Sequence, residues 1–268
     1  MNFIEFFGTI VKPKQTKGKG LWVPCDNLEI ENNIFAIKDK DVNMFLIKSD
    51  NGYIAIDSGY KNSINVKKGF ETLNINPEKV HTVLLTHVDL DHAGGVDSNS
   101  YKIFPNAKIY LSEEESKYLN RKLFRKKILG VNLSSPISIH KGYTLLEDNQ
   151  SFNIDGVDIT SIFTPGHTLG HTSYLINEKK LFVGDTLIIG DKGGFCFMDF
   201  WNINSNLNIK SLHKQYSLCK EKNVDLIITS HSGITSDIDF AFNNIDKMPN
   251  WKKKDFVFRK DAEYNPYI

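Results

Sequence analysis

Short runs of apolar residues, each about the length of a β-strand, recur along the middle of the chain. In the stretch NMFLIKSDNGYIAIDSG, which begins at Asn43, two such runs flank Asn51 and Gly52, a pair that favours a two-residue hairpin turn. This pattern predicts two adjacent antiparallel strands. Other apolar or β-branched runs predict strands at residues 82–85, 157–163, 173–176, 181–183 and 226–229.

Apolar residues also recur at helical spacing in three segments, residues 64–73, 113–129 and 207–219. Strands in meander order, mixed with helices, predict two sheets that are covered by helices. The chain contains no repeat, no low-complexity segment and no Pro/Gly/Ser-rich linker between two halves. We therefore expect a single domain over residues 1–268.

A basic segment, LNRKLFRKK at residues 119–127, lies within the second predicted helix. Such a run is usually the solvated face of an amphipathic helix, and we adopt that interpretation. The alternative is a surface that receives an anionic substrate or nucleic acid. The same helix is a candidate for a homodimer contact or for a lid.

Composition and charge narrow the classes of function. Of the 268 residues, 40% are hydrophobic and 12% aromatic, which is enough apolar material for a sizeable core. Lys and Arg number 33 against 32 Asp and Glu, so we expect no nucleic acid and no membrane as a partner. The N-terminal residues show no export signal, and we expect a cytoplasmic protein. Cys25, Cys196 and Cys219 form no C-x-x-C pair, which favours buried free thiols.

Histidine and aspartate residues gather at the ends of the predicted strands. One strand runs directly into four of them in HTVLLTHVDLDHAGG, and three other strand ends supply one each. Strand ends hold side chains rigidly and leave them open to a shared cleft. Imidazole and carboxylate groups are ligands of Zn²⁺, Fe and Mn. The predicted metal ligands are His87, Asp89, Asp91, His92, His167, Asp185 and His231.

Each of these residues also has a purely structural explanation. Asp89 and Asp91 could cap a helix that begins near His92. A lone histidine at any of these positions is more often a satisfied core or surface residue. Because four independent strand ends follow the same pattern, we favour the metal site.

The order of the motifs resembles the metallo-β-lactamase superfamily. T-H-V-D-L-D-H-A-G-G is followed by T-P-G-H-T-L-G-H-T, F-V-G-D-T and T-S-H-S-G, and A-I-D-S-G is similar to the family's early strand ending in I-D-x-G. The motif-bearing core spans about residues 43–233. The resemblance implies an α+β fold, a four-layer αββα sandwich of two face-to-face sheets, with a binuclear metal site at one edge.

Family roles, transferred position by position, divide the ligands between two metal ions. Asp185 would bridge the two ions. The resemblance implies a hydrolase in which a hydroxide between the metals attacks an ester-, lactone-, thioester- or amide-like small molecule, or a phosphodiester. Asp91 is the candidate catalytic residue that orients this hydroxide and takes its proton. The expected division is His87, Asp89 and His167 for one metal, and Asp91, His92 and His231 for the other.

Asp89 stands where the family usually has a histidine, in the motif H-x-H-x-D-H. If Asp89 is a ligand, three carboxylates and one hydroxide balance the charge of two divalent cations, which makes the metals poorer electrophiles. Two zinc ions are the expected cofactors, with Fe or Mn as alternatives, because a two-histidine, one-carboxylate set suits them. In another alternative, Asp89 turns away from the metal. Flavodiiron-type proteins carry a glutamate at this position, so a diiron oxygen-binding or redox protein is the alternative function.

Other residues are candidates for contact with the ligands or with the substrate, although packing in the core would explain them too. These residues are Asp57, His171, Phe195 and Phe197. The wording of the second motif is nearest to lactonases that open N-acyl homoserine lactones, but those enzymes place a tyrosine where this chain has Ile188. The oxyanion donor expected at that position is missing. Glyoxalase II-like enzymes are disfavoured, because the stretch after His231 is short for a glutathione-binding helical region.

Overall fold

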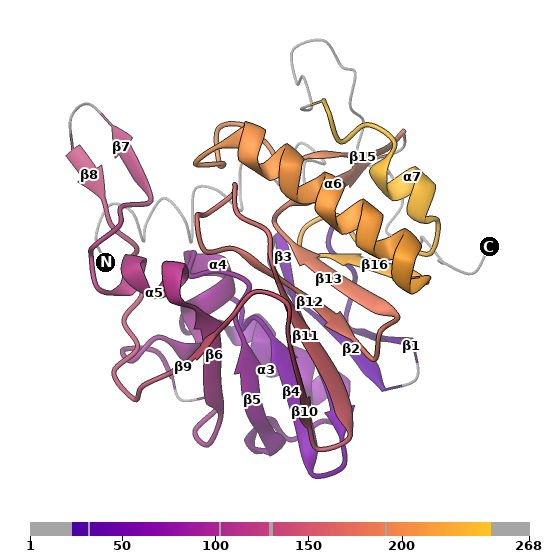
Figure 1. Ribbon diagram of the computed structural model, residues 1–268. Helices are drawn as coiled ribbons and strands as arrows, with labels where there is room; N and C mark the ends of the chain where they lie inside the picture. Colours follow the sequence, from indigo (N-terminus) through magenta and orange to yellow (C-terminus); the bar gives the residue numbers. More distant parts are fainter. Residues whose placement is uncertain (1–22, 32, 102, 129–130, 191, 248–268) are drawn as a thin grey trace.

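Two mixed β-sheets pack face to face in the computed structural model, and helices lie outside them (Figure 1). The structure describes residues 23–31, 33–101, 103–128, 131–190 and 192–247. This arrangement is the four-layer αββα sandwich, so the expected fold class is confirmed. No helix within these ranges is both long enough and apolar enough to span a membrane.

The first sheet has the strand order β1-β2-β3-β4-β5-β6-β9. Strands β4, β5, β6 and β9 run parallel to one another, which brings their carboxyl ends to one edge. Helix α3 (Ile64–Thr72) connects β4 to β5. The strands are β1 (Leu28–Glu31), β2 (Ile34–Asp39), β3 (Val42–Ser49), β4 (Gly52–Ile56), β5 (Val80–Leu84), β6 (Lys108–Ser112) and β9 (Thr144–Leu146).

The second sheet has the order β10-β11-β12-β13-β16-β17. Strands β13 and β16 run parallel, and helix α6 (Ser205–Lys222), which lies between them in sequence, covers the outer face of this sheet (Figure 1). The strands are β10 (Gln150–Ile154), β11 (Val157–Phe163), β12 (Thr172–Ile176), β13 (Lys180–Gly184), β16 (Leu226–Thr229) and β17 (Ile234–Thr235).

Strand β3 shows how one apolar run serves two hydrophobic layers. Phe45 and Ile47 belong to the cluster between the sheets, whereas Met44 and Leu46 belong to the cluster under α3. Alternate side chains of a strand point to opposite faces, so a strand buried on both sides reads as a continuous apolar run. Across the sheets, the rings of Phe45 and Phe182 meet edge to face, with centroids 5.4 Å apart.

The smaller elements lie around the sheets. Two two-stranded sheets, β7–β8 and β14–β15, are separate from the main sheets. Figure 1 shows the β7–β8 pair projecting as an arm beyond α5. The smaller elements are η2 (Pro77–Lys79), α4 (Leu90–Ala93), η3 (Gly94–Val96), α5 (Glu113–Leu119), β7 (Lys126–Ile128), β8 (Val131–Leu133), β14 (Leu187–Gly190), β15 (Gly193–Cys196) and α7 (Ile238–Phe242).

The predicted strands all occur, and the hairpin after Asn43 forms with a turn displaced by one residue. Ser49 pairs with Gly52, so the two turn residues are Asp50 and Asn51 rather than Asn51 and Gly52. Gly52 has a φ of +154°, and a Cβ there would lie 2.2 Å from the carbonyl oxygen of Lys79. A close approach of two backbone segments therefore explains this glycine.

The helix predicted at residues 113–129 is wrong beyond Leu119. Asn120 ends α5, Arg121 has a φ of +57°, and the chain turns into the β7–β8 arm. The interpretation of residues 119–127 as a solvated helix face is therefore also wrong. The homodimer contact or lid expected of this segment now concerns a shorter helix and an arm, and it stays a prediction.

Candidate metal centre

The predicted ligands converge where the carboxyl ends of β5, β13 and β16 meet the loop between β11 and β12. Two hydrogen bonds connect the sheets at this edge. Thr172 N donates to Thr86 O at 2.9 Å, and the Tyr174 hydroxyl donates to Leu85 O at 2.7 Å. Gly184, just before the predicted ligand Asp185, has a φ of +55°. The strand ends therefore present their side chains to one shared space.

Two groups of side chains at this edge have the spacing of metal ligands. Within each group, the ligating atoms lie within 4.8 Å of one another. We name the first group, His87, His167 and Asp185, the first position, and the second group, Asp91, His92 and His231, the second position. All six residues are buried.

Asp185 faces both positions. Its Oδ2 lies 3.5 Å from His167 Nε2 and 3.3 Å from His231 Nε2, and its Oδ1 lies 3.4 Å from His92 Nε2. Ligands about 2.0–2.2 Å from a tetrahedral zinc ion lie roughly 3.3–3.6 Å from one another. These separations fit a carboxylate that bridges two ions. Burial raises the pKa of Asp185, but the charges of His231 and His92 lower it, and the net effect in the metal-free protein is a pKa well below the usual range.

The four histidine rings are oriented in the same way. In each ring Nδ1 has a hydrogen-bond partner on the side away from the site, and Nε2 points into the space between the ligands. The Nδ1 partners are Thr86 Oγ1 for His87 at 3.0 Å, Asp57 Oδ2 for His92 at 2.8 Å, Asn202 Oδ1 for His167 at 3.3 Å and Asp41 O for His231 at 2.5 Å. Such partners fix the tautomer of a metal-binding histidine. Within the described ranges, His87 Nε2, His92 Nε2 and Asp185 Oδ1 are buried without a hydrogen-bond partner, so these residues fit metal ions.

Asp89 is placed differently from the other predicted ligands. Its Oδ2 lies 3.4 Å from His167 Nε2 and 3.6 Å from His87 Nε2, within reach of the first position. The same carboxylate accepts two-pronged hydrogen bonds from Arg125, whose Nε lies 2.7 Å from Oδ1 and whose Nη2 lies 2.8 Å from Oδ2. Asp89 precedes α4 but makes no side-chain capping bond, so the capping explanation does not apply to it.

Arg125 is a residue of the site that was not predicted from the sequence. Besides Asp89, its Nη2 contacts His167 Nε2 at 2.9 Å and donates to the carbonyl oxygen of Trp201 at 2.9 Å. Burial raises the pKa of Asp89, but the charge of Arg125 lowers it, and the net pKa is well below the usual range. Burial and the same charge lower the pKa of His167 to about 3, which leaves this imidazole neutral.

The ion pair changes the charge expected from the sequence. Asp89 and Arg125 together are neutral, like the histidine that the family usually has in place of Asp89. Paired with Arg125, Asp89 therefore does not make the metals poorer electrophiles in the way expected from the sequence. A signal for Arg125 did exist: an extra buried carboxylate needs a cationic partner, and residues 119–127 are the most basic stretch near the motifs.

Asp57 and His171 both contact predicted ligand residues. Asp57 accepts hydrogen bonds from His92 Nδ1, from Thr86 N at 2.8 Å and from the Thr86 hydroxyl, which joins the strand end of β5 to that of β4. His171 Nε2 accepts the backbone N–H of Asp185 at 3.1 Å, and its Nδ1 contacts the hydroxyl of Thr164 at 2.9 Å. Both nitrogens of His171 are therefore engaged away from the ligand cluster.

Phe197 borders the ligand cluster, whereas Phe195 lies in β15. The ring of Phe197 meets His167 edge to face with centroids 4.9 Å apart, and it lies 6.0 Å from the ring of His231. Phe195 and Ile188 pair across β14 and β15 and pack in the same small apolar cluster as Phe197. Ile188 thus belongs to an apolar wall beside the site.

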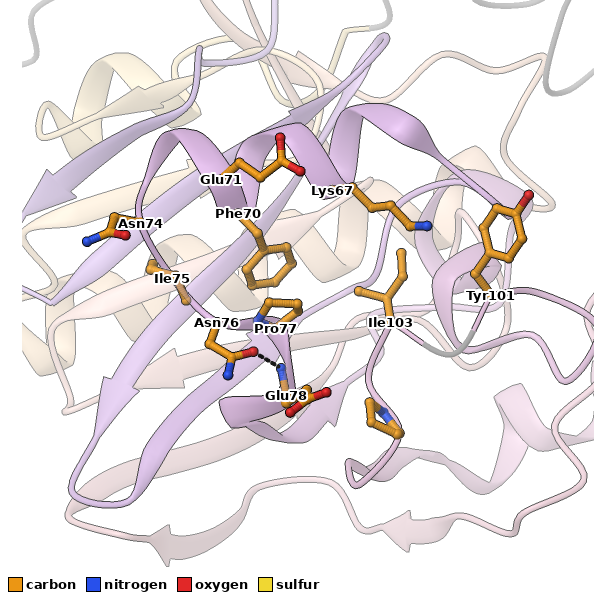
Figure 2. A pocket seen from close by; sticks show the side chains of 11 residues that line it. Lys67, Phe70, Glu71, Asn74, Ile75, Asn76, Pro77, Glu78, Tyr101 and Ile103 are labelled. Carbon is orange, nitrogen blue, oxygen red and sulfur yellow. Dashed lines mark hydrogen bonds between the residues drawn. The ribbon is translucent and has the colours of Figure 1, made fainter.

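A separate surface cavity of about 570 Å³ lies beside α3 and η2. Figure 2 shows Phe70, Ile75 and Pro77 on its apolar side, with Lys67 and Tyr101 at one end. None of its lining residues is a predicted metal ligand. This cavity is therefore distinct from the candidate metal centre.

Known proteins are similar to this chain in sequence and in fold. The family model "Metallo-beta-lactamase superfamily" matches residues 37–231. A hydroxyacylglutathione hydrolase of Buchnera aphidicola is 27% identical over 236 residues, covering 83% of this chain and 80% of that protein. An atrochrysone carboxyl ACP thioesterase of Aspergillus fumigatus is 30% identical over 111 residues, 41% of this chain and 28% of that protein. The structure of a β-lactamase from Chitinophaga pinensis matches with a TM-score of 0.59 and 24% identity, covering 79% of this chain and 80% of that one.

The family model covers most of the described chain, and it ends at His231, the last of the predicted ligands. The match therefore includes every strand end that contributes a side chain to the two positions. The relatives are named as hydrolases, and the donor set at the sheet edge suits divalent metal ions. The chain belongs to the metallo-beta-lactamase superfamily and is a metal-dependent hydrolase.

Proposed function

We propose that this enzyme hydrolyses thioesters of small acyl groups with the help of two zinc ions. The observation that carries the proposal is the pair of three-residue ligand groups joined by Asp185, in which the buried Nε2 atoms of His87 and His92 have no hydrogen-bond partner among the described residues. A pair of divalent cations held by these residues would supply hydroxide near neutral pH and polarise the carbonyl group of the substrate.

The protein's own residues divide the remaining work. Asp91 lies at the second position, with its Oδ2 3.4 Å from His231 Nε2, and we assign it the role of accepting the proton of the attacking water. Asp57 keeps the ring of His92 in one tautomer. Phe197 and the apolar cluster around it exclude water from one side and suit an acyl chain.

The thioester class is supported by the relatives, because both the hydroxyacylglutathione hydrolase and the ACP thioesterase are named for thioester substrates. The sequence argument against glyoxalase II-like enzymes concerned a glutathione-binding region and not the metal centre. We therefore propose the acyl thioester bond as the reacting group. The substrate panel below identifies the thiol that carries the acyl group.

The diiron alternative rested on the carboxylate of Asp89. Since Arg125 engages both oxygens of this carboxylate, the resemblance to a glutamate-ligated diiron centre is weaker than the sequence suggested. Lactone hydrolysis uses the same chemistry and belongs in the substrate panel.

The test combines metal analysis with a substrate panel. Protein purified without added metal is analysed for its elements, and free thiol release is measured with an acyl-glutathione, an acyl-coenzyme A and an acyl-N-acetylcysteamine, next to a lactone and a phosphodiester. We expect two zinc ions per chain and turnover of thioesters. Asp185→Asn should lose metal and turnover, whereas the exposed Asp26→Asn should retain both.

Stoichiometric iron with an oxygen-sensitive visible absorption band, together with no turnover in the panel, would contradict the proposal. If only the lactone is turned over, the proposed hydrolytic metal centre is supported, but the proposed thioester substrate is wrong and a lactone takes its place.

A further inference from the structure

Arg125 lies outside every motif of the family resemblance, yet its guanidinium contacts two residues of the ligand cluster, Asp89 and His167. We propose that Arg125 sets the affinity of the first position for its metal ion. By holding Asp89 and placing a positive charge beside His167, it makes the first position the weaker of the two. The proposal rests on the proposed metal centre but not on the nature of the substrate.

The contacts of Arg125 Nη2 imply that Arg125 and a metal ion compete for the Nε2 atom of His167. Nη2 carries two N–H groups but lies within 2.9 Å of three acceptors, Asp89 Oδ2, His167 Nε2 and Trp201 O. One of the three contacts can therefore be given up without leaving an N–H group unpaired. His167 Nε2 is the atom that a metal ion needs, so a metal at the first position has to displace the contact between Arg125 and His167.

The second position has surroundings of the opposite character. His92 donates from Nδ1 to the carboxylate of Asp57, at 2.8 Å. A carboxylate behind a histidine increases the basicity of the ligating nitrogen and strengthens metal binding. At the first position, a guanidinium beside the ligating nitrogen repels a divalent cation instead. The two positions, which share Asp185, should therefore bind metal with unequal affinity.

Arg125 is fixed in place rather than free to swing away. Its backbone N–H donates to Leu133 O at 2.8 Å across the base of the β7–β8 arm. The arm is joined to the first motif by the hydroxyl of Ser135, which donates to Val88 O at 2.9 Å. Only 13% of the Arg125 side chain is exposed. The positive charge is therefore a built-in part of the site.

The experiment is a metal titration that does not use activity. Wild type and variants are stripped with a chelator, and Co²⁺ or Zn²⁺ is titrated against a chromophoric chelator so that each binding step yields a dissociation constant. His167→Ala should abolish the weaker step and His231→Ala the tighter one, which assigns the steps to the positions. Arg125→Gln should strengthen the weaker step by about tenfold or more, the scale of neighbour effects on metal affinity.

Two further variants separate charge from fold. Lys122→Gln removes a charge from the same segment and should leave both steps unchanged, and Arg125→Lys should keep the weaker step weak. If Arg125→Gln does not fold, Asp89→His combined with Arg125→Gln restores the family's usual residue at the first position and should give two tight steps.

The results discriminate between the two proposals. If the weaker metal-binding step keeps its affinity or loses affinity in Arg125→Gln, control by Arg125 is overturned and the metal centre stays intact. The same conclusion follows if the double variant still has one weak step. A wild-type chain that binds no metal would overturn the proposed metal centre itself. Absence of thioester turnover would overturn only the proposed substrate class.

Discussion

Replacement of Glu115 tests whether one buried carboxylate joins the two loops that hold His87 and His167. Glu115 lies on α5 with no exposed surface. Its Oε1 accepts the backbone N–H of Val88, next to His87, and its Oε2 accepts the hydroxyl of Thr168, next to His167, both at 2.7 Å. Glu115→Ala removes both acceptors and leaves two buried donors without partners.

The expected loss of stability follows from these contacts. A buried donor left unpaired costs about 1–3 kcal/mol, so Glu115→Ala should lower the free energy of unfolding by about 3–5 kcal/mol once the small cavity is included. Burial raises the pKa of Glu115, because removal from water disfavours its charged form. Glu115→Gln removes this charge and keeps an acceptor for Val88, so it should lose only about 1 kcal/mol.

Urea unfolding followed by far-ultraviolet circular dichroism gives both free energies, and chelator competition gives the metal affinity of the same samples. Both measurements are made on metal-free and zinc-loaded protein. We expect Glu115→Ala to weaken metal binding as well, because the two ligand loops lose their common support. A loss below about 1 kcal/mol for Glu115→Ala, or equal losses for the two variants, would refute the reasoning.

Three other predictions concern the same edge of the sheets. Gly166→Ala should destabilise the fold by about 1–3 kcal/mol in urea unfolding, because its φ of +146° disfavours a side chain and its Cβ would lie 2.3 Å from the backbone of Asn208; an unchanged free energy of unfolding would contradict this. Asp57→Ala should weaken the tighter metal step by about 10–100-fold in chelator competition, since His92 loses its carboxylate partner; an unchanged dissociation constant would contradict this role. Removal of metal should lower the midpoint of thermal unfolding, and zinc at about 1,000 times its dissociation constant should restore roughly 4 kcal/mol; identical melting curves would exclude binding to the folded state.

The sequence was most informative where local patterns decide the structure. Strand β11 and strand β16 occur at the predicted residues, because a short apolar run bounded by polar residues and turns has few other stable arrangements. Since those strands end where the predicted ligands begin, the convergence of the ligands at one sheet edge could also be expected. The parallel pairing of β13 with β16, which sets Asp185 beside His231, was not predicted, because the apolar pattern suggested strands in meander order and the family resemblance implied only two face-to-face sheets.

The sequence was least informative between residues 119 and 133. Leucines at helical spacing favoured a helix that continued to residue 129, and no Gly or Pro within residues 113–129 marks an earlier end. The helix nevertheless ends at Asn120, and Arg121 takes a positive φ that turns the chain toward the arm. Several basic side chains in this segment are alike in sequence, and only the path of the chain selects Arg125 as the partner of Asp89.

The pairing of Asp89 with Arg125 also constrains how this sequence can evolve. Loss of the arginine alone leaves a buried carboxylate without its partner, and loss of the aspartate alone leaves a buried cation among histidines, so each single change is costly although the double change is not. The path to the more common histidine therefore requires two substitutions in segments 36 positions apart along the chain. Among relatives, we expect an acidic residue at the first of these positions to be inherited together with a basic residue on the arm.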